Sequence, residues 1–243
     1  MGKYSPSCFT LKHVYLQGKI NHLFYLLDKQ LLGIFKMERA VLIKFGSYKN
    51  ISSLRDQGVV YMNTLPYFRN IEDNDLRGDP FDSVSEIQRG TKGHVLIPST
   101  GQKLQITSFD LRIGPESPEK INLFCMYALR PQHGTYPVSE EYYRFGAHAL
   151  IIFNVPKFID KIRAAIRYKK ITGSSNLVEY IDNDHIGEAG PFKKLQKFSY
   201  QSEWRLMCEN GPGEPRTLNI GPINDISVLV ETININNEIT ITP

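Results

Sequence analysis

Short apolar segments recur along this chain of 243 residues, and only one segment has the length and periodicity of a long helix. Runs of apolar and β-branched residues bounded by Gly, Pro, Asn or Asp are typical of strands. Such runs occupy residues 40–45, 59–63, 122–129, 147–153, 177–181, parts of 192–209, 216–220, 226–231 and 238–241, and residues 93–114 have the pattern of a hairpin that turns near 98–101. Strands in this number, with two or three helices, predict an α+β fold built on a mixed or antiparallel sheet.

Two segments are predicted to be helical. Residues 50–57 form a short helix, with Asn50 as its N-cap and Gly58 as its stop. In residues 155–170 apolar side chains fall on one face of a helix and basic side chains on the other. The basic face consists of Lys157, Lys161, Arg163 and Arg167. This face is either an ordinary solvated surface or a footprint for the phosphates of a nucleic acid.

The composition is that of a globular protein, with 41% hydrophobic and 22% charged residues. A net charge of +4 allows an acidic partner such as nucleic acid but does not require one. The three Cys residues lie far apart and form no C-x-x-C, so we expect neither a disulfide framework nor a Cys zinc site. That usage fits a reducing compartment, and no apolar run reaches the roughly 18 residues of a spanning helix. The expected location is the cytoplasm of a host cell.

The first 36 residues are predicted to be an N-terminal helical extension. Its two apolar runs, 23–27 and 31–35, are separated by Asp28-Lys29-Gln30, unlike the unbroken apolar stretch of a signal peptide. An amphipathic helix that docks on the body or on a partner fits this pattern better. Residues 37–243 are then a single α+β domain, and Met37 also leaves open a shorter product that starts there.

Residues 200–206 combine an amide, a carboxylate, an indole and a guanidinium in a segment that otherwise has the pattern of a strand. Glu203 and Arg205 are two residues apart, so they lie on the same face of that strand. Between them is Trp204, the only Trp of the chain. The charged pair is either an exposed ion pair at a solvated edge or part of the wall of a site.

A second polar cluster lies in a long loop at residues 67–82. Its charged residues are interleaved with apolar side chains, so we expect the loop to pack on the body. Asp79, Asp82 and Glu86 have the ligand chemistry for Mg²⁺ or Ca²⁺, as in a metal-dependent nuclease. EF-hand spacing and an accompanying His are both absent, so we predict no metal site. P-loop, Rossmann and serine-hydrolase motifs are also absent from the sequence.

Three segments together resemble a family of uncharacterised bacterial and prophage proteins. The family shows a strand–helix–Gly–strand opening, a central Asn/Gly-Asp-Pro-x-Glu/Asp motif and a late Tyr-x-x-Glu-Trp-Arg motif. Here these are residues 42–61, Gly78-Asp79-Pro80-Phe81-Asp82 and Tyr200-Gln201-Ser202-Glu203-Trp204-Arg205. The resemblance spans roughly residues 38–231. Some members are linked to abortive phage infection, which implies a toxin or phage-defence effector with an antitoxin or a host protein as its partner.

A looser resemblance connects the chain to ADP-ribosyltransferases. It is carried by the order of a strand, a short helix ending in Gly, a second strand, and a late Gln-x-Glu at the start of a strand. This resemblance implies an ADP-ribosyltransferase-like fold, NAD as the substrate, and ADP-ribosyl transfer or NAD cleavage as the reaction. Glu203 would stabilise the oxocarbenium-like transition state, Gln201 would orient the acceptor, and Arg205 completes the implied catalytic set.

The same resemblance implies a set of NAD-binding residues. Lys44 takes the position of the first strand that holds the nicotinamide ribose or its phosphates, where His or Arg is usual in those enzymes. Tyr61 or Tyr67 is the aromatic residue that stacks near the nicotinamide. Asp79 of the central motif joins them, and we expect the heads of Lys44, Asp79 and Glu203 to meet in one cleft within about 10 Å.

Two other functions remain open at this point. A nucleic-acid-binding or nuclease effector would use the basic face of residues 155–170 together with Lys193, Lys194 and Lys197. A non-enzymatic interaction protein would bind its host or toxin partner through residues 23–35. In that case Glu203 and Arg205 would only pair with each other.

Overall fold

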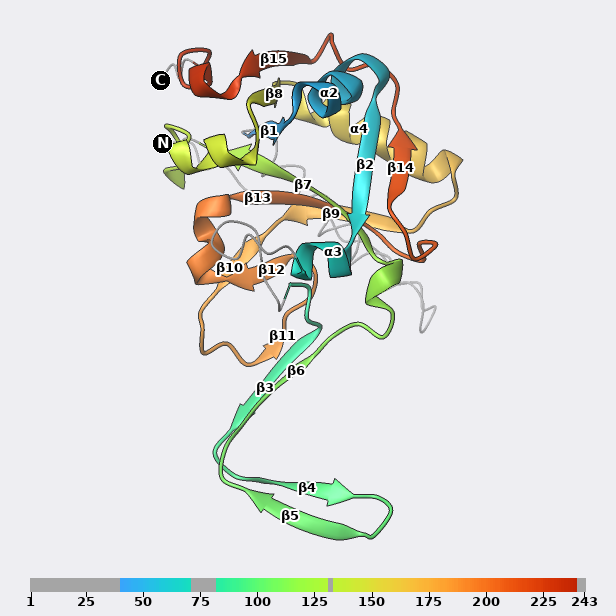
Figure 1. The fold of residues 1–243 in the computed structure, drawn as a ribbon, viewed down its shortest axis with the longest axis vertical. Coiled ribbons are helices and arrows are strands. Elements are labelled where there is room, and N and C mark those ends of the chain that lie inside the picture. The colour runs from blue at the N-terminus through green and yellow to red at the C-terminus, as the bar shows by residue number, and fades with distance from the viewer. Residues whose placement is uncertain (1–39, 71–81, 131–132, 240–243) are drawn as a thin grey trace, which may run out of the picture.

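The structure is a computed structural model that describes residues 40–70, 82–130 and 133–239 (Figure 1). Its strands are β1 (Val41–Gly46), β2 (Val59–Thr64), β3 (Glu86–Gly90), β4 (Gly93–Ile97), β5 (Gln102–Ile106), β6 (Phe109–Ile113), β7 (Asn122–Leu129), β8 (His148–Ile152), β9 (Gly173–Leu177), β10 (Glu179–Ile181), β11 (Gly187–Glu188), β12 (Lys193–Leu195), β13 (Glu203–Cys208), β14 (Arg216–Asn219) and β15 (Ser227–Glu231). Its helices are α2 (Tyr48–Ser52), the π-helical turn η1 (Ser53–Gln57), α3 (Leu65–Arg69), α4 (Val155–Tyr168) and the 3-10 segments η2 (Pro118–Lys120), η4 (Glu140–Phe145), η5 (Gln196–Gln201) and η6 (Thr232–Asn234).

The predicted α+β class and the antiparallel sheet are confirmed, but the helical segments are shorter and more numerous than two or three. The N-cap of α2 is Ser47 rather than Asn50, because the Ser47 hydroxyl accepts the backbone N–H of Asn50. Gly58 ends this helical unit in the left-handed region, as predicted. Residues 67–69, predicted as loop, belong to α3, where Pro66 occupies the first turn that Pro favours.

Two further expectations are limited by the described ranges. The strand predicted at 238–241 is not found at residues 238–239, and its remainder lies outside the described residues. The extension at 1–36 and most of the polar loop, residues 71–81, also lie outside them. Among the helices that the structure describes, none has both the length and the apolar character needed to cross a membrane.

The main sheet has a fork at its centre, around β7. One edge of β7 pairs with β13, which in turn pairs with β9. The opposite edge is shared by two strands, since β1 pairs with residues 127–129 and β2 with residues 122–123. Between these pairings, residues 124–126 of β7 face a gap in which β1 and β2 diverge. Beyond the fork, β1 continues to β8 and β15, and β2 continues to β14.

The two faces of the sheet have separate cores. On one face α4 packs its apolar side, and the Phe158 ring lies 6.2 Å from the Trp204 indole. On the other face Phe45, Tyr127, Tyr142 and Phe145 form an aromatic cluster with ring centroids about 5 Å apart. Because side chains alternate along β13, Trp204 points toward α4 while Glu203 and Arg205 point to the opposite face.

A two-stranded arm projects from the body (Figure 1). Its base is the β3–β6 ladder, to which β11 adds a short third strand, and its tip is the β4–β5 hairpin. The predicted hairpin turn near residues 98–101 is confirmed, although β6 pairs with β3 rather than with β4. A separate pair of short strands, β10 and β12, is parallel and lies beside the start of β13 (Figure 1).

Candidate functional site

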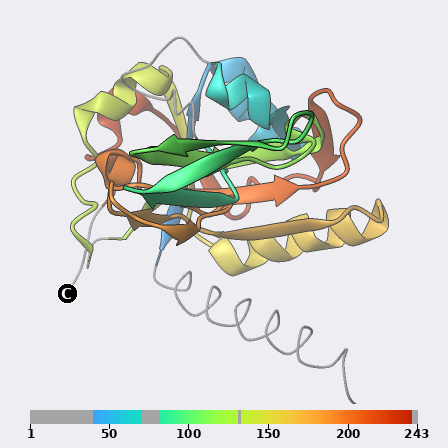
Figure 2. The same ribbon diagram turned by 90° about the horizontal axis from the view of Figure 1, so that it is seen from below.

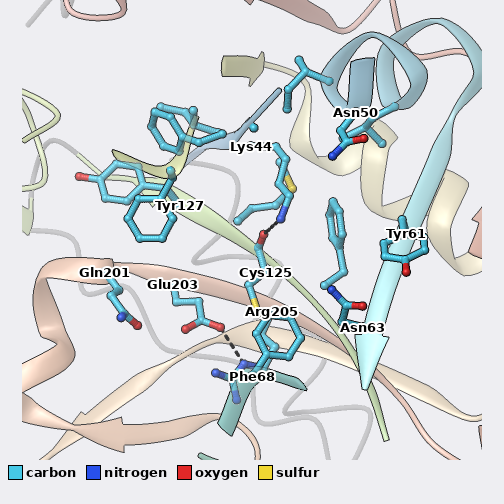
Figure 3. Close-up of a pocket in the computed structure, with 18 of the residues that line it drawn as sticks. Lys44, Asn50, Tyr61, Asn63, Phe68, Cys125, Tyr127, Gln201, Glu203 and Arg205 are labelled. Atoms are coloured by element: carbon cyan, nitrogen blue, oxygen red, sulfur yellow. Dashed lines mark hydrogen bonds and ion pairs between the residues drawn. The ribbon is translucent and has the colours of Figure 1, made fainter. Parts of the chain in front are cut away.

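The fork between β1 and β2 contains a pocket of about 760 Å³ (Figure 3). Helix α2 stands over one side and contributes Asn50, while β2 forms a wall that carries Tyr61 and Asn63. The aromatic cluster of the opposite face closes another side with Tyr127. A volume of this size falls within the range of small-molecule sites, which are mostly apolar clefts with a few convergent polar groups.

Lys44 lies in the gap of the fork. Its Nζ donates a hydrogen bond of 2.7 Å to the carbonyl oxygen of Cys125 and lies 4.5 Å from the centre of the Phe124 ring. The divergence of β1 and β2 leaves this carbonyl without a strand partner, and a buried carbonyl needs one. Lys44 therefore replaces a missing ladder bond and places a positive charge on the pocket wall.

The opposite part of the pocket is a buried cluster of four charged side chains centred on Arg205. The Arg205 Nε donates to Glu203 Oε1 at 2.8 Å, and its two Nη atoms donate to the two oxygens of Asp82 at 2.7 and 3.0 Å. The guanidinium also donates to the Ser83 hydroxyl and to the Pro191 carbonyl oxygen. All of the side-chain nitrogens of Arg205 therefore donate hydrogen bonds. The two bonds to Asp82 have the paired, bidentate geometry that a guanidinium and a carboxylate favour.

Lys194 completes the cluster from the neighbouring strand β12. Its Nζ lies 3.0 Å from Glu203 Oε2 and 3.5 Å from Asp82 Oδ2, and it donates to the side-chain oxygen of Gln201 at 2.8 Å. Two cations therefore balance two carboxylates, all of them buried. Residues from β12, β13 and the segment before β3 are held together by this neutral cluster.

The cluster keeps both carboxylates ionised. Burial alone raises the pKa of Glu203, but the positive charges of Arg205 and Lys194 outweigh burial and hold this pKa well below its usual range. The same balance lowers the pKa of Asp82. Burial also raises the pKa of the neighbouring Cys125 thiol to about 12, so this cysteine is a neutral thiol near neutral pH.

The lowered pKa values predict a stability that depends on pH. Because each carboxyl pKa is lower in the folded chain than in the unfolded chain, its stabilisation is complete above about pH 5 and is lost as the pH falls further. We expect urea denaturation to show a smaller loss of stability between pH 6 and about pH 3 in Asp82→Asn than in the wild type, by about 1 kcal/mol. Asp110→Asn, which removes an exposed paired carboxylate, is the control and should keep more of the wild-type slope. Equal slopes for Asp82→Asn and the wild type would contradict this assignment.

The structure brings together most of the residues that the sequence predicted for the site. Glu203 starts β13 and lies at the floor of the pocket with Gln201 and Arg205, while Lys44 lies on the wall. Tyr61 and Tyr67 also line the pocket, each about half exposed. Asp79 lies outside the described residues, so its predicted convergence on this cleft stays a prediction.

Two interpretations of charged residues are wrong. The Glu203–Arg205 pair is not exposed at a solvated edge, since β13 lies between two strands and Asp82 and Lys194 cover the pair. Lys194 therefore cannot contact phosphates at the surface as the nucleic-acid hypothesis expected, because it is buried in the cluster. On α4, Lys157 pairs with Asp225 and Arg163 with Asp160, so part of the basic face is already neutralised.

Sequence reasoning missed several residues of the site. Asn50 and Asn63 present amide side chains to the pocket, and Cys125 and Phe68 also line it. Asp82 was considered only as a metal ligand, whereas it accepts two hydrogen bonds from Arg205. Its place as the last residue of the Gly-Asp-Pro-x-Asp motif was the signal that could have linked it to the Glu-Trp-Arg motif.

Comparisons of the chain with protein-family models, with curated protein sequences and with solved structures found no match.

Proposed function

We propose that the fork pocket binds NAD and that the chain cleaves the bond between nicotinamide and ribose, acting as a prophage-borne toxin or phage-defence effector. The observation that carries this proposal is an ionised carboxylate, Glu203, at the floor of a pocket with the volume of a small-molecule site. The order of elements that resembles ADP-ribosyltransferases, with Gln201 two residues before Glu203, supports the same reaction.

The chemistry needs a group with the properties of Glu203. When the C1′–N1 bond breaks, both electrons leave with nicotinamide, which becomes neutral, and positive charge develops on the ribose ring. A carboxylate in contact with that ring stabilises the charge. Water or the nucleophile of a target then attacks C1′ and loses a proton, which gives free ADP-ribose or an ADP-ribosylated product.

The neutrality of the charged cluster restricts how Glu203 can act. Because Arg205 and Lys194 balance Glu203 and Asp82, the cluster has little effect on a distant cation, and Glu203 acts only at contact distance. Arg205 is fully buried and is therefore a positioning residue, which fixes the Glu203 carboxylate. The amide of Gln201 is fixed in the same way by Lys194.

The other walls of the pocket offer the remaining contacts for a dinucleotide. Tyr61 and Tyr67 expose ring surface on which a planar base or nicotinamide can stack. Lys44 provides positive charge for a phosphate or a ribose hydroxyl, and the amides of Asn50 and Asn63 can pair with the edge of a base or a carboxamide. Tyr61, Lys44 and the two asparagines lie on the sides of the pocket that Glu203 does not occupy (Figure 3).

The test uses a pocket residue whose loss does not endanger the fold. Tyr61 is 54% exposed and lines the pocket, whereas Tyr168 is 88% exposed on α4 and does not line it. We expect Tyr61→Ala to lower the rate of nicotinamide release from NAD by about 5- to 150-fold, the range for loss of one aromatic stacking contact. Tyr168→Ala should leave the rate unchanged, with nicotinamide followed by chromatography.

Induced expression in bacteria provides the second measurement. The wild type should arrest growth and lower cellular NAD, and Tyr61→Ala should do both less at equal protein abundance. If the wild type releases no nicotinamide and leaves cellular NAD unchanged, the proposed reaction is wrong. Growth arrest without NAD loss would instead favour a binding effector.

A further inference from the structure

The arm built from β3, β4, β5 and β6 has one apolar face. Residues directly opposite each other in an antiparallel ladder point to the same face, so Val95 and Leu104 lie side by side. Ile97 and Ile106 share that face, because each is two residues from one of them. Val95 and Leu104 remain 48% and 44% exposed, although they are the central pair of the hairpin.

The apolar face continues past the bend of the arm onto β6. A Cβ placed on Gly93 would lie 3.4 Å from both Ile106 and Phe109, so these two side chains meet over the glycine. At Gly90 a Cβ would come within 2.5 Å of the Phe109 ring, which therefore lies directly over that residue. Leu111 and Ile113 follow Phe109 at alternate positions and are 50% and 40% exposed. We call this surface the arm strip, and it consists of Val95, Ile97, Leu104, Ile106, Phe109, Leu111 and Ile113.

The charged residues of the arm lie almost entirely on its other face. There Arg89 pairs with Asp110, and Lys103 lies opposite Leu96. On the strip side of these four strands Glu86, at the base of the arm, is the one charged side chain. A two-stranded ribbon has no second layer to cover an apolar face, and exposed strips of this kind mark interaction surfaces.

We propose that the arm strip is a contact through which two copies of this chain associate, arm against arm about a twofold axis. In a twofold contact the same surface of each copy meets its counterpart, so the surface must complement itself. An uncharged apolar strip meets this requirement, because no like charges come together. The basic residues of both arms would then remain on the outside. The arm projects away from the body in Figure 1, and Figure 2 shows the molecule from the side of the arm.

The size of the strip is sufficient for a weak dimer. The two ladders contain ten residue pairs, five in each. At about 3.4 Å per residue, each ladder presents a face about 17 Å long and about 10 Å wide. The two ladders of both arms together present roughly 700 Å² in projection and more in accessible surface, which approaches the ~1,000 Å² expected of a specific contact. Association should therefore depend on concentration in the micromolar range.

Sedimentation velocity of the full chain between about 1 and 200 μM tests this proposal. We expect the wild type to shift from monomer to dimer over this range and Leu104→Lys to remain monomeric. Leu96→Lys is the matched control, because Leu96 is 52% exposed on the same hairpin but points to the opposite face. This control should dimerise like the wild type. A wild type that stays monomeric, or a dimer that survives Leu104→Lys, would overturn the proposal.

If both lysine variants are monomeric, the added charge could prevent association from either face of the hairpin. Crosslinking then shows which face makes the contact. Leu104→Cys and Leu96→Cys contain the same native cysteines, so a short bismaleimide compares only the two faces of the hairpin. A covalent dimer formed through Leu104→Cys and not through Leu96→Cys supports the strip as the contact. Equal crosslinking of both variants, or of neither, rejects it. The proposal does not depend on NAD chemistry, so nicotinamide release by Leu104→Lys can remain normal while dimerisation is lost.

Discussion

Replacing Arg205 with methionine is expected to lower the free energy of unfolding by about 3–5 kcal/mol, measured by urea denaturation at pH 7. Methionine fills part of the space but removes the charge and the five hydrogen bonds that the guanidinium makes. Asp82 and Glu203 would then share Lys194, which leaves a buried negative charge without compensation. Since domains are typically stable by 5–15 kcal/mol, this single change would remove a large part of the total.

Arg112→Met is the matched control for this effect. Arg112 also pairs with an aspartate, Asp110, at 3.3 Å, but the Asp110 side chain is 46% exposed. Exposed pairs contribute about 0–1 kcal/mol, because water screens them and the side chains lose freedom when they pair. Similar losses for Arg205→Met and Arg112→Met would contradict the importance of burial.

A double-mutant cycle separates the ion pair from general damage to the core. Asp82→Asn removes one carboxylate of the cluster and is itself expected to destabilise the fold. If Arg205 and Asp82 interact as their paired hydrogen bonds indicate, the double variant should lose less than the sum of the single losses. The expected difference is about 0.5–3 kcal/mol, the range for residues in direct contact.

The pairing of Glu203 with two buried cations determines how this residue should be tested. Glu203→Gln keeps the shape of the side chain, but it removes the charge to which both Arg205 and Lys194 are paired. A loss of toxicity in that variant would therefore reflect either lost chemistry or lost folded protein. Tyr61→Ala avoids this ambiguity, because Tyr61 is half exposed and lies outside the charged cluster.

The elements that could be predicted from the sequence are those with strong local signals. The strand at 122–129, the helix that begins at Val155 and the stop at Gly58 each depend on neighbouring residues, and each is confirmed. The shared face of Glu203 and Arg205 is confirmed as well, because alternation along a strand is a local property. Their burial was not predictable, since it depends on Asp82 and Lys194, which reach the pair from other parts of the chain.

The pocket itself depends on strand pairing between distant segments. The apolar pattern of β1 and β2 identifies both as strands but does not indicate that they share one edge of β7. The gap in the fork follows from that shared edge, and it explains why a strand rich in apolar residues contains Lys44.

Gly58→Ala is expected to destabilise the fold by about 3 kcal/mol or more, because two separate costs add. Gly58 has φ +70°, a left-handed conformation that costs a residue with a Cβ about 1–2 kcal/mol. Its Cβ would also lie 2.0 Å from the carbonyl oxygen of Gly221, so one of the two backbones must move. That contact joins the end of the α2–η1 unit to the segment after β14, where Ile220 donates to the Gly58 carbonyl oxygen.

Gly101→Ala isolates the conformational part of this cost. Gly101 has φ +69°, almost the same as Gly58, but a Cβ there meets no atom within 4 Å. It should therefore lose only about 1 kcal/mol in urea denaturation, the cost of the left-handed conformation alone. Gly58 also sets where β2 begins, so Gly58→Ala should displace the wall that carries Tyr61 and lower nicotinamide release in the protein that remains folded. Equal losses of stability in the two variants would show that the backbone near Gly221 moves freely, and the pocket wall would then not depend on this close approach.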